Sequence, residues 1–359
     1  MTYLGESGGK QREPVNDLLV WQRLGTSATS SKSPFYDRLF ELCIADHNAG
    51  NADIAALLER TPMSYDAAVG LRLLAGVQRC WLAGVASELD EVWPTANQSG
   101  DADRAYAVMQ SMFRDPPALL LDWLTRDPQT NEVGRSAGLA IGLDFIAHET
   151  GLPVRLFEIG SSGGLNLRID EYGYTDAHGR SWGNANSPLQ FGADAFGADL
   201  QFQGHAVIAE RRGCDLNPID ASTEAGGLQL QSYVWPDQQL RVKRLHDALR
   251  VARKFPVMVD QSSAAPWIDQ HFVSKPGFVT VLMHSIMWQY LPESEQTEIR
   301  ALIDARGSVA HSDAPMAWLT LEPSPEMIHA NVTVTAWPGG EPRVVATSGF
   351  HGPPIRGFA

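Results

Sequence analysis

The sequence predicts an α/β fold in which a mostly parallel sheet ends in an antiparallel hairpin and follows an N-terminal all-α domain. Three observations predict it: helical periodicity over the first 150 residues, alternation of strands and helices from Val154 onward, and two closing strands joined by residues 338–342. Alternating strands and helices are typical of a parallel sheet covered on both faces, because each connection crosses back over one face. We therefore predict two domains, residues 1–150 and residues 151–359.

The predicted helical domain contains apolar side chains at helical spacing. Leu39, Leu42, Cys43 and Ala45 share one helix face. Further helices are predicted over residues 54–60, 64–86, 101–114, 117–124 and 132–148. Gly151 and Pro153 end the last of them, because glycine caps a helix and proline cannot continue it.

The predicted α/β domain begins with the apolar run at residues 154–159. The other strands before the hairpin are predicted at residues 206–214, 256–260, 278–284 and 316–321, with helices at residues 235–254, 264–272 and 293–306. The last two strands, residues 332–337 and 343–348, form the hairpin. Residues 173–205 interrupt this alternation and are predicted to form a β-hairpin insertion.

The turn after the first predicted strand carries the most functional information, and residues 154–166 read VRLFEIGSSGGLN. The stretch fails the dinucleotide fingerprint G-x-G-x-x-G, because Ser162 and Leu165 occupy its later glycine positions. It matches the nucleophile elbow G-x-S-x-G of hydrolases, with Ser162 as the nucleophile. It also resembles the first motif of class I S-adenosylmethionine-dependent methyltransferases, in which an acid-x-glycine and small residues end the strand: Glu158, Gly160, Ser161 and Gly163. An ordinary strand-to-helix turn is a further interpretation.

Context favours the methyltransferase-like interpretation. A hydrolase elbow follows several strands, whereas the chain ahead of Val154 looks helical and has no His-Gly-Gly-Gly segment. A serine hydrolase stays open, since an acid (Asp313 or Glu322) and then His351 follow Ser162 in the order of a hydrolase triad. A non-catalytic ligand-binding protein of the same fold is also open, because function lies in the site rather than the fold.

The methyltransferase resemblance implies S-adenosylmethionine as the cofactor. Its methionine part would lie over the glycine turn with its amine near Glu158, and Asp215 would accept hydrogen bonds from the ribose hydroxyls. Asp260 or Gln261 would bind the adenine. Asp215 lies 55 positions after Gly160, whereas about 20 are expected. An Asx turn at Asp215 and a helix cap after Gln261 are the alternatives.

Two further groups are predicted to act on the methyl acceptor. His284 lies at the end of the fourth predicted strand and is the candidate general base, and Trp288 or Tyr290 would stack on the substrate or on the sulfonium cation. A polar run at residues 129–135 precedes the first strand, and its Asn131, Glu132 and Arg135 are predicted to bind the acceptor. Helix capping explains part of that run equally well, and a structural histidine is the alternative for His284.

Composition limits the partners. The formal net charge is −14 and the pI is about 5.1, which argues against a general nucleic-acid binder and favours a small-molecule substrate. Three cysteines without a C-x-x-C pair, and an N-terminus without an apolar leader, favour a cytoplasmic location. No apolar run is long enough to span a membrane, and the ten histidines show no metal-ligand spacing, so neither membrane nor metal is predicted.

Motifs spread along the chain resemble an uncharacterised bacterial family, the domain of unknown function numbered 2332. They comprise residues 129–135, 157–167, 182–183, 213–218, 234–238 and 284–285. The resemblance extends from about Phe35 to the C-terminus. It implies a methyltransferase-like α/β core behind a helical domain and supplies no substrate.

Overall fold

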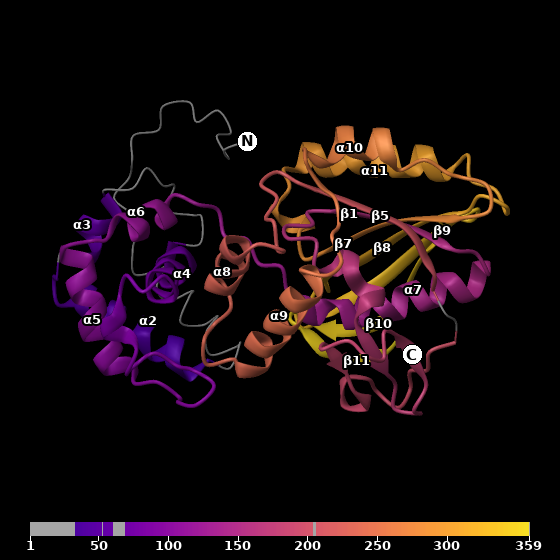
Figure 1. Ribbon diagram of the computed structural model, residues 1–359. Coiled ribbons are helices and arrows are strands. Elements are labelled where there is room, and N and C mark those ends of the chain that lie inside the picture. Colours follow the sequence, from indigo (N-terminus) through magenta and orange to yellow (C-terminus); the bar gives the residue numbers. More distant parts are fainter. Residues whose placement is uncertain (1–32, 52, 60–68, 204–205, 359) are drawn as a thin grey trace. The chain divides into compact units, whose positions relative to one another are not determined.

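A computed structural model describes residues 33–51, 53–59, 69–203 and 206–358, and its chain folds into two compact units (Figure 1). The helical unit comprises Met1–Thr130 and Leu228–Lys243, and the α/β unit comprises Asn131–Gly227 and Arg244–Ala359. The boundary predicted at residue 150 therefore differs from the observed division. Residues 131–150 belong to the α/β unit, and a short segment from the second half of the chain belongs to the helical unit.

The helical unit is built from short helices around an aromatic and aliphatic core. Its elements are α2 (Pro34–Asn48), α3 (Asp53–Glu59), α4 (Val69–Leu82), η1 (Ser87–Leu89), α5 (Ala102–Arg114) and α6 (Ala118–Leu124). Leu39 and Cys43 are fully buried and Leu42 is half-buried, whereas Ala45 is exposed, so the predicted helix face is confirmed except at Ala45. The predicted helix over residues 64–86 is observed from Val69, and its first five residues lie outside the described chain.

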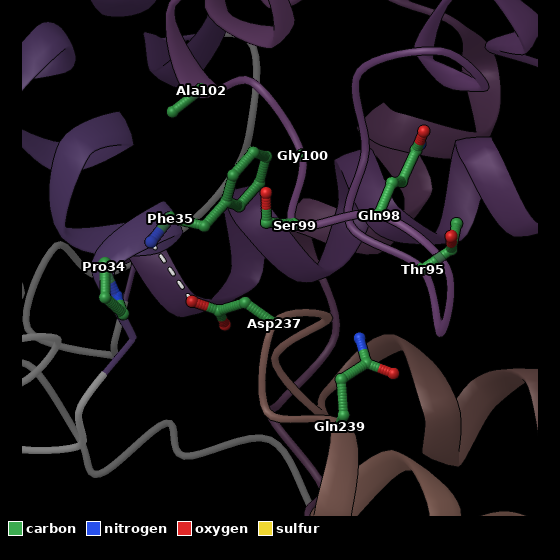
Figure 2. Close-up of a pocket in the computed structure, with 9 residues that line it drawn as sticks. All are labelled: Pro34, Phe35, Thr95, Gln98, Ser99, Gly100, Ala102, Asp237 and Gln239. Carbon is green, nitrogen blue, oxygen red and sulfur yellow. Dashed lines mark hydrogen bonds between the residues drawn. The ribbon is translucent and has the colours of Figure 1, made fainter.

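Residues 234–238 cap the first described helix of this unit. The Asp237 carboxylate accepts hydrogen bonds from Ser33 Oγ at 2.7 and 2.9 Å. It also accepts from Phe35 N at 3.1 Å (Figure 2). A carboxylate is favoured there because the first turn of a helix leaves N–H groups unpaired. Tyr36 packs against Trp235 at 5.1 Å between ring centroids. The helix predicted over residues 235–254 accordingly begins later, as α9 (Gln239–Ala252).

The α/β unit contains an eight-stranded, mostly parallel sheet, which confirms the predicted mixed α/β class. The strand order is β11-β10-β9-β8-β7-β1-β5-β6. Parallel pairing joins β8 (Met316–Pro323), β7 (Val279–Ser285), β1 (Val154–Ile159), β5 (Ile208–Asp215) and β6 (Val259–Gln261). β9 (Ala330–Trp337), β10 (Pro342–Gly349) and β11 (Gly352–Gly357) add in antiparallel fashion. β11 was not predicted, since Pro353 and Pro354 disfavour a strand, but at a sheet edge their missing N–H groups are tolerated.

The chain reverses its direction of travel across the sheet between β1 and β7. From β1 it continues to β5 and β6 on one side, and it then returns to β7 and β8 on the other side. In such sheets the connections leave two neighbouring strands in opposite directions and open a crevice outside their carboxyl ends, where ligands bind.

Helices cover both faces of this sheet (Figure 1). On one face, α10 (Ala264–His271) and α11 (Glu293–Gly307) share a buried cluster with Phe157, Leu282 and Met316. On the other face lies α7 (Ser136–Thr150), and a Cβ on its Gly142 would come within 2.3 Å of Leu319 Cδ1. Glycine lets this helix approach the sheet closely, and the contact places α7 in the α/β unit rather than in the predicted helical domain.

The predicted insertion is a small three-stranded sheet of order β3-β2-β4. β2 (Gly173–Thr175) and β3 (Ser181–Gly183) form the antiparallel pair, and β4 (Gln190–Phe191) adds in parallel. Tyr174 stacks on Trp182 at 5.2 Å and on Phe191 at 5.3 Å. The remaining elements are α8 (Glu224–Ser232) and the short helices η2 (Val133–Arg135), η3 (Asn166–Glu171), η4 (Ala193–Ala195) and η5 (Trp288–Tyr290).

We predict that Gly134→Ala destabilises the α/β unit by about 3 kcal/mol or more. A Cβ at Gly134 would lie 2.1 Å from the backbone oxygen of His351, which cannot rotate away. Gly227→Ala, inside α8, is the matched control: its Cβ meets only Leu249, at 3.4 Å. The control is expected to gain about 0.5–1 kcal/mol from helix propensity. Urea unfolding of both variants measures the difference, and equal midpoints would contradict the close approach.

Candidate functional site

The predicted cofactor and catalytic residues gather at the carboxyl edge of the parallel strands. Glu158 is the residue before the last of β1, Asp215 is the last residue of β5, and His284 is the residue before the last of β7. Asp260 and Gln261 close the short strand β6. The structure therefore places all five at the carboxyl ends of the parallel strands, the edge at which sheets of this kind bind ligands.

The glycine turn is held in an unusual backbone conformation. Gly160, Ser162 and Gly164 have φ values of 64°, 50° and 63°. A positive φ is disfavoured for serine, so neighbouring groups must hold it. Ser162 N donates to Asp215 Oδ2 at 2.8 Å, and Ser161 Oγ donates to the Glu158 carbonyl at 2.8 Å. Ser161 thus has a structural role in the turn.

Glu158 is a buried acid with one unoccupied oxygen. Its side chain is 2% exposed, and its Oε2 has no hydrogen-bond partner among the described residues. Burial, and next the negative charge of Asp215, raise the pKa of Glu158 well above its ordinary value. Ser162 Oγ and Asn166 Oδ1, nearby along the chain, are also buried without a partner in the described chain. Each such atom costs roughly 1–3 kcal/mol, so their clustering indicates a place for a polar ligand or water.

Asp215 uses its carboxylate to join two loops. Besides the bond from Ser162 N, its Oδ1 accepts from Asn217 N at 2.9 Å, as the predicted Asx turn requires. An ionised carboxylate only accepts hydrogen bonds, and both of these bonds come from backbone N–H groups of the two loops.

Asp260 and Gln261 are engaged within the protein. Arg212 binds the Asp260 carboxylate through two bonds of 2.6 and 2.9 Å, and Trp267 Nε1 donates to it at 2.7 Å. The Arg212 hydrogen bond keeps the pKa of Asp260 below its ordinary value. Gln261 Nε2 donates to the carbonyl of Leu216 at 3.1 Å. These contacts give both residues a role in fixing the edge of the sheet.

A second polar cluster surrounds His284. Its Nδ1 lies 2.7 Å from Glu322 Oε1 on β8, and the same oxygen accepts from Met287 N at 3.1 Å. His284 is 1% exposed, and neither its Nε2 nor Glu322 Oε2 has a partner in the described chain. Because an ionised carboxylate only accepts, a neutral His284 carries its proton on Nδ1 and presents the lone pair of Nε2.

Aromatic rings and one cation enclose this histidine. Trp288 stacks on His284 at 5.2 Å, and Trp318 lies 5.7 Å from it. The Arg300 guanidinium lies over Trp288 at 4.7 Å and over Trp318 at 5.7 Å. Trp318, Arg300 and the pairing of Glu322 with His284 were not predicted. The available signal was the two-residue period of a strand, which puts Trp318 and Glu322, four positions apart, on one face of β8.

Glu158 and His284 lie at the ends of neighbouring strands but project to opposite faces. Glu158 is in register with Met283, whose side chain alternates with that of His284. His284 accordingly shares its face with Leu282 and Trp318, beneath α11. A ligand that contacts both residues must lie across the strand ends.

The predicted acceptor-binding run also lies at this edge. Asn131 Oδ1 accepts from Leu165 N in the glycine turn at 2.9 Å, and Arg135 Nη1 donates to the Ser285 carbonyl at 3.2 Å. Glu132 Oε1 accepts from Gly134 N at 3.0 Å and caps η2. The run therefore ties the loops of β1 and β7 together, and capping accounts for Glu132.

The hydrolase triad is not assembled around Ser162. Ser162 Oγ has no partner in the described chain, whereas His351 Nδ1 lies 3.6 Å from Glu132 Oε2. Glu322 bonds to His284, and Asp313 pairs with His311 ahead of β8, at the amino end of that strand. The proposed members of the triad thus have other partners.

A pocket of about 470 Å³ lies in the helical unit, lined by Phe35, Gln98, Asp237 and neighbours (Figure 2). It contains no predicted site residue, and its carboxylate serves as the cap of α2. Among the described residues, no group of three His, Cys, Asp or Glu side chains is placed to hold a metal ion. Within the same residues, none of the helices has the length and apolar character needed to traverse a bilayer.

The fold, together with the residues at the carboxyl ends of its parallel strands, defines a mixed α/β protein with a polar site at that edge of the sheet. The chain belongs to the family DUF2332, described as an uncharacterized protein conserved in bacteria, which matches residues 20–356. No curated protein and no solved structure matches the chain.

We predict that raising the pH destabilises the protein through Glu158. Its pKa is raised in the folded state, so its contribution is complete below the unfolded value of 4.5 and is lost as the pH rises through the folded pKa. Over that interval the free energy of unfolding should fall by up to about 1.4 kcal/mol per pH unit relative to Glu158→Gln. Denaturant unfolding across a pH series measures it. Glu149→Gln, at an exposed position of α7, is the control, and a wild-type slope equal to that of Glu158→Gln would refute the assignment.

Proposed function

We propose that the α/β unit binds S-adenosylmethionine at the β1–β7 crevice and transfers its methyl group to a small molecule. The observation that carries this proposal is the buried Glu158, whose unpartnered oxygen lies beside a glycine turn of positive φ. A cationic amine is a fitting ligand for such an acid, because it would offset the cost of burying the carboxylate. The reversal between β1 and β7 supports the same location.

The remaining contacts follow from the same placement. The backbone of Gly160 and Gly163 would approach the methionine part, and the Asp215 carboxylate would accept hydrogen bonds from the ribose hydroxyls. The adenine would lie near β6. Asp260 is committed to Arg212 and Trp267, so it would act there by fixing the loop, and Gln261 would contact the base.

His284 is the proposed general base. When bound, S-adenosylmethionine supplies an electrophilic methyl group on a sulfonium. Glu322 holds the imidazole so that Nε2 takes the proton that the acceptor loses. Asn131 and Arg135 keep the loops of β1 and β7 in place, which makes them positioning residues.

A serine hydrolase is the second candidate function. The positive φ of Ser162 and its unpartnered Oγ are features that a nucleophile elbow shares. Against it, no described histidine is bonded to Ser162, and the turn follows the first strand of the sheet. A third possibility is a protein that binds the ligand without turnover, which would use the Glu158 site and need no general base at His284.

We predict that the wild-type protein binds S-adenosylmethionine and S-adenosylhomocysteine, but not NAD, in calorimetric titrations. Glu158→Gln removes the charge that would pair with the amine and should raise the Kd by about tenfold or more. Glu149→Gln should bind as the wild type does. Affinity unchanged in Glu158→Gln, or absent from the wild type, would remove this site assignment.

We predict that a fluorophosphonate probe leaves Ser162 unlabelled, because no general base among the described residues is bonded to its hydroxyl. Intact-protein mass spectrometry measures the addition, with Ser162→Ala as the reference. Stoichiometric labelling that disappears in Ser162→Ala would establish the hydrolase instead.

A further inference from the structure

The cluster around His284 contains more unsatisfied polar groups than a structural pair needs. Besides His284 Nε2 and Glu322 Oε2, the indole nitrogens of Trp288 and Trp318 are buried and have no partner in the described chain. The three rings lie within 5.7 Å of one another by their centroids. Four such atoms in one place favour a polar ligand or ordered water as their partner.

Arg300 adds an uncompensated positive charge at the same place. Its guanidinium lies over both indoles, and no described carboxylate forms an ion pair with it. By contrast, Arg306 on the same helix binds Asp269 at 2.7 Å. In a chain with a net charge of −14, an arginine without an acid partner beside a polar cluster favours an anionic ligand. Stacking on the two rings also fixes the guanidinium, so it loses little freedom on binding.

The chemistry of the unsatisfied atoms specifies the ligand. The indole N–H groups and Arg300 only donate, so they require an acceptor such as a carboxylate. Glu322 Oε2 accepts, and so does His284 Nε2 once its proton is on Nδ1, so these two require a hydroxyl or amine proton. One small molecule that carries an acid group at one end and a hydroxyl or amine at the other satisfies both sets.

We infer that His284, Trp288, Arg300, Trp318 and Glu322 form the binding site for a small hydroxy or amino acid, held by its carboxylate at Arg300 and the indoles. The hydroxyl or amine of the ligand faces His284 and Glu322. Naming this ligand as the methyl acceptor rests on the proposed function, whereas the acid-binding site stands independently of it.

The test uses 4-hydroxybenzoate and its neutral isostere 4-hydroxybenzamide, titrated into the full chain and followed by tryptophan fluorescence without S-adenosylmethionine. The acid should bind about tenfold or more tightly than the amide, as expected for a charge-assisted pair. Arg300→Gln should abolish that preference, and Arg306→Gln should retain it. Trp288→Phe, which removes one N–H donor, should weaken the acid by a few fold.

Equal affinity for acid and amide, no saturable binding up to millimolar concentration, or an equal loss in Arg306→Gln would overturn the inference. Arg300 is exposed, so its variant should keep the wild-type melting temperature. Parallel titration with S-adenosylmethionine separates the two proposals. Acid binding that depends on Arg300 without cofactor binding would contradict only the transfer reaction, and cofactor binding without acid preference would contradict only this site.

Discussion

The hydrogen bond from Ser162 N to the Asp215 carboxylate holds together the part of the structure on which the site depends. A left-handed conformation costs a residue other than glycine about 1–2 kcal/mol. Ser162 keeps this conformation because its backbone N–H and carbonyl both form hydrogen bonds with the loop that begins at Asp215. The Ser162 carbonyl in turn accepts from Ile219 N at 3.1 Å. Two hydrogen bonds therefore join the turn after β1 to the loop after β5. A ligand bound over the turn would therefore contact residues that follow both β1 and β5.

The two polar clusters at the carboxyl edge differ in what surrounds them. Glu158 lies on the face of the sheet that it shares with Met283, where burial and the charge of Asp215 raise its pKa. His284 lies on the other face, among rings and beside a cation. The strands themselves separate the two faces, and Phe157 and Leu282 are buried on the face of His284. A reaction that used both groups would have to take place beyond the carboxyl ends of β1 and β7.

The strands, turns and candidate residues of single segments were predictable from the sequence, whereas the contacts between distant segments were not. An apolar run that ends in Glu158 and a glycine turn identifies a strand and a tight turn without reference to the rest of the chain. Glu322 meets His284 only because β8 lies next to β7, and strand order is not contained in either segment. The apolar character of residues 136–147 all around α7 gave no face to assign, so the helix was placed with the wrong unit. Asp237 caps a helix about two hundred positions earlier, which no local pattern shows.

The pairing of His284 with Glu322 is hard to explain by stability alone. A buried histidine with a structural role usually has both ring nitrogens bonded, whereas here one nitrogen and one carboxylate oxygen are left without partners in the described chain. Leaving two such atoms buried costs about 2–6 kcal/mol in total, and an apolar pair of similar volume is often neutral or stabilising at such a position. The backbone N–H groups of Met287 and Trp288 nonetheless converge on the other oxygen of Glu322, at 3.1 and 3.4 Å. Glu322 is therefore fixed through one oxygen and can orient His284 toward a further hydrogen-bond partner. That geometry favours a role of the pair in proton transfer over a role in packing.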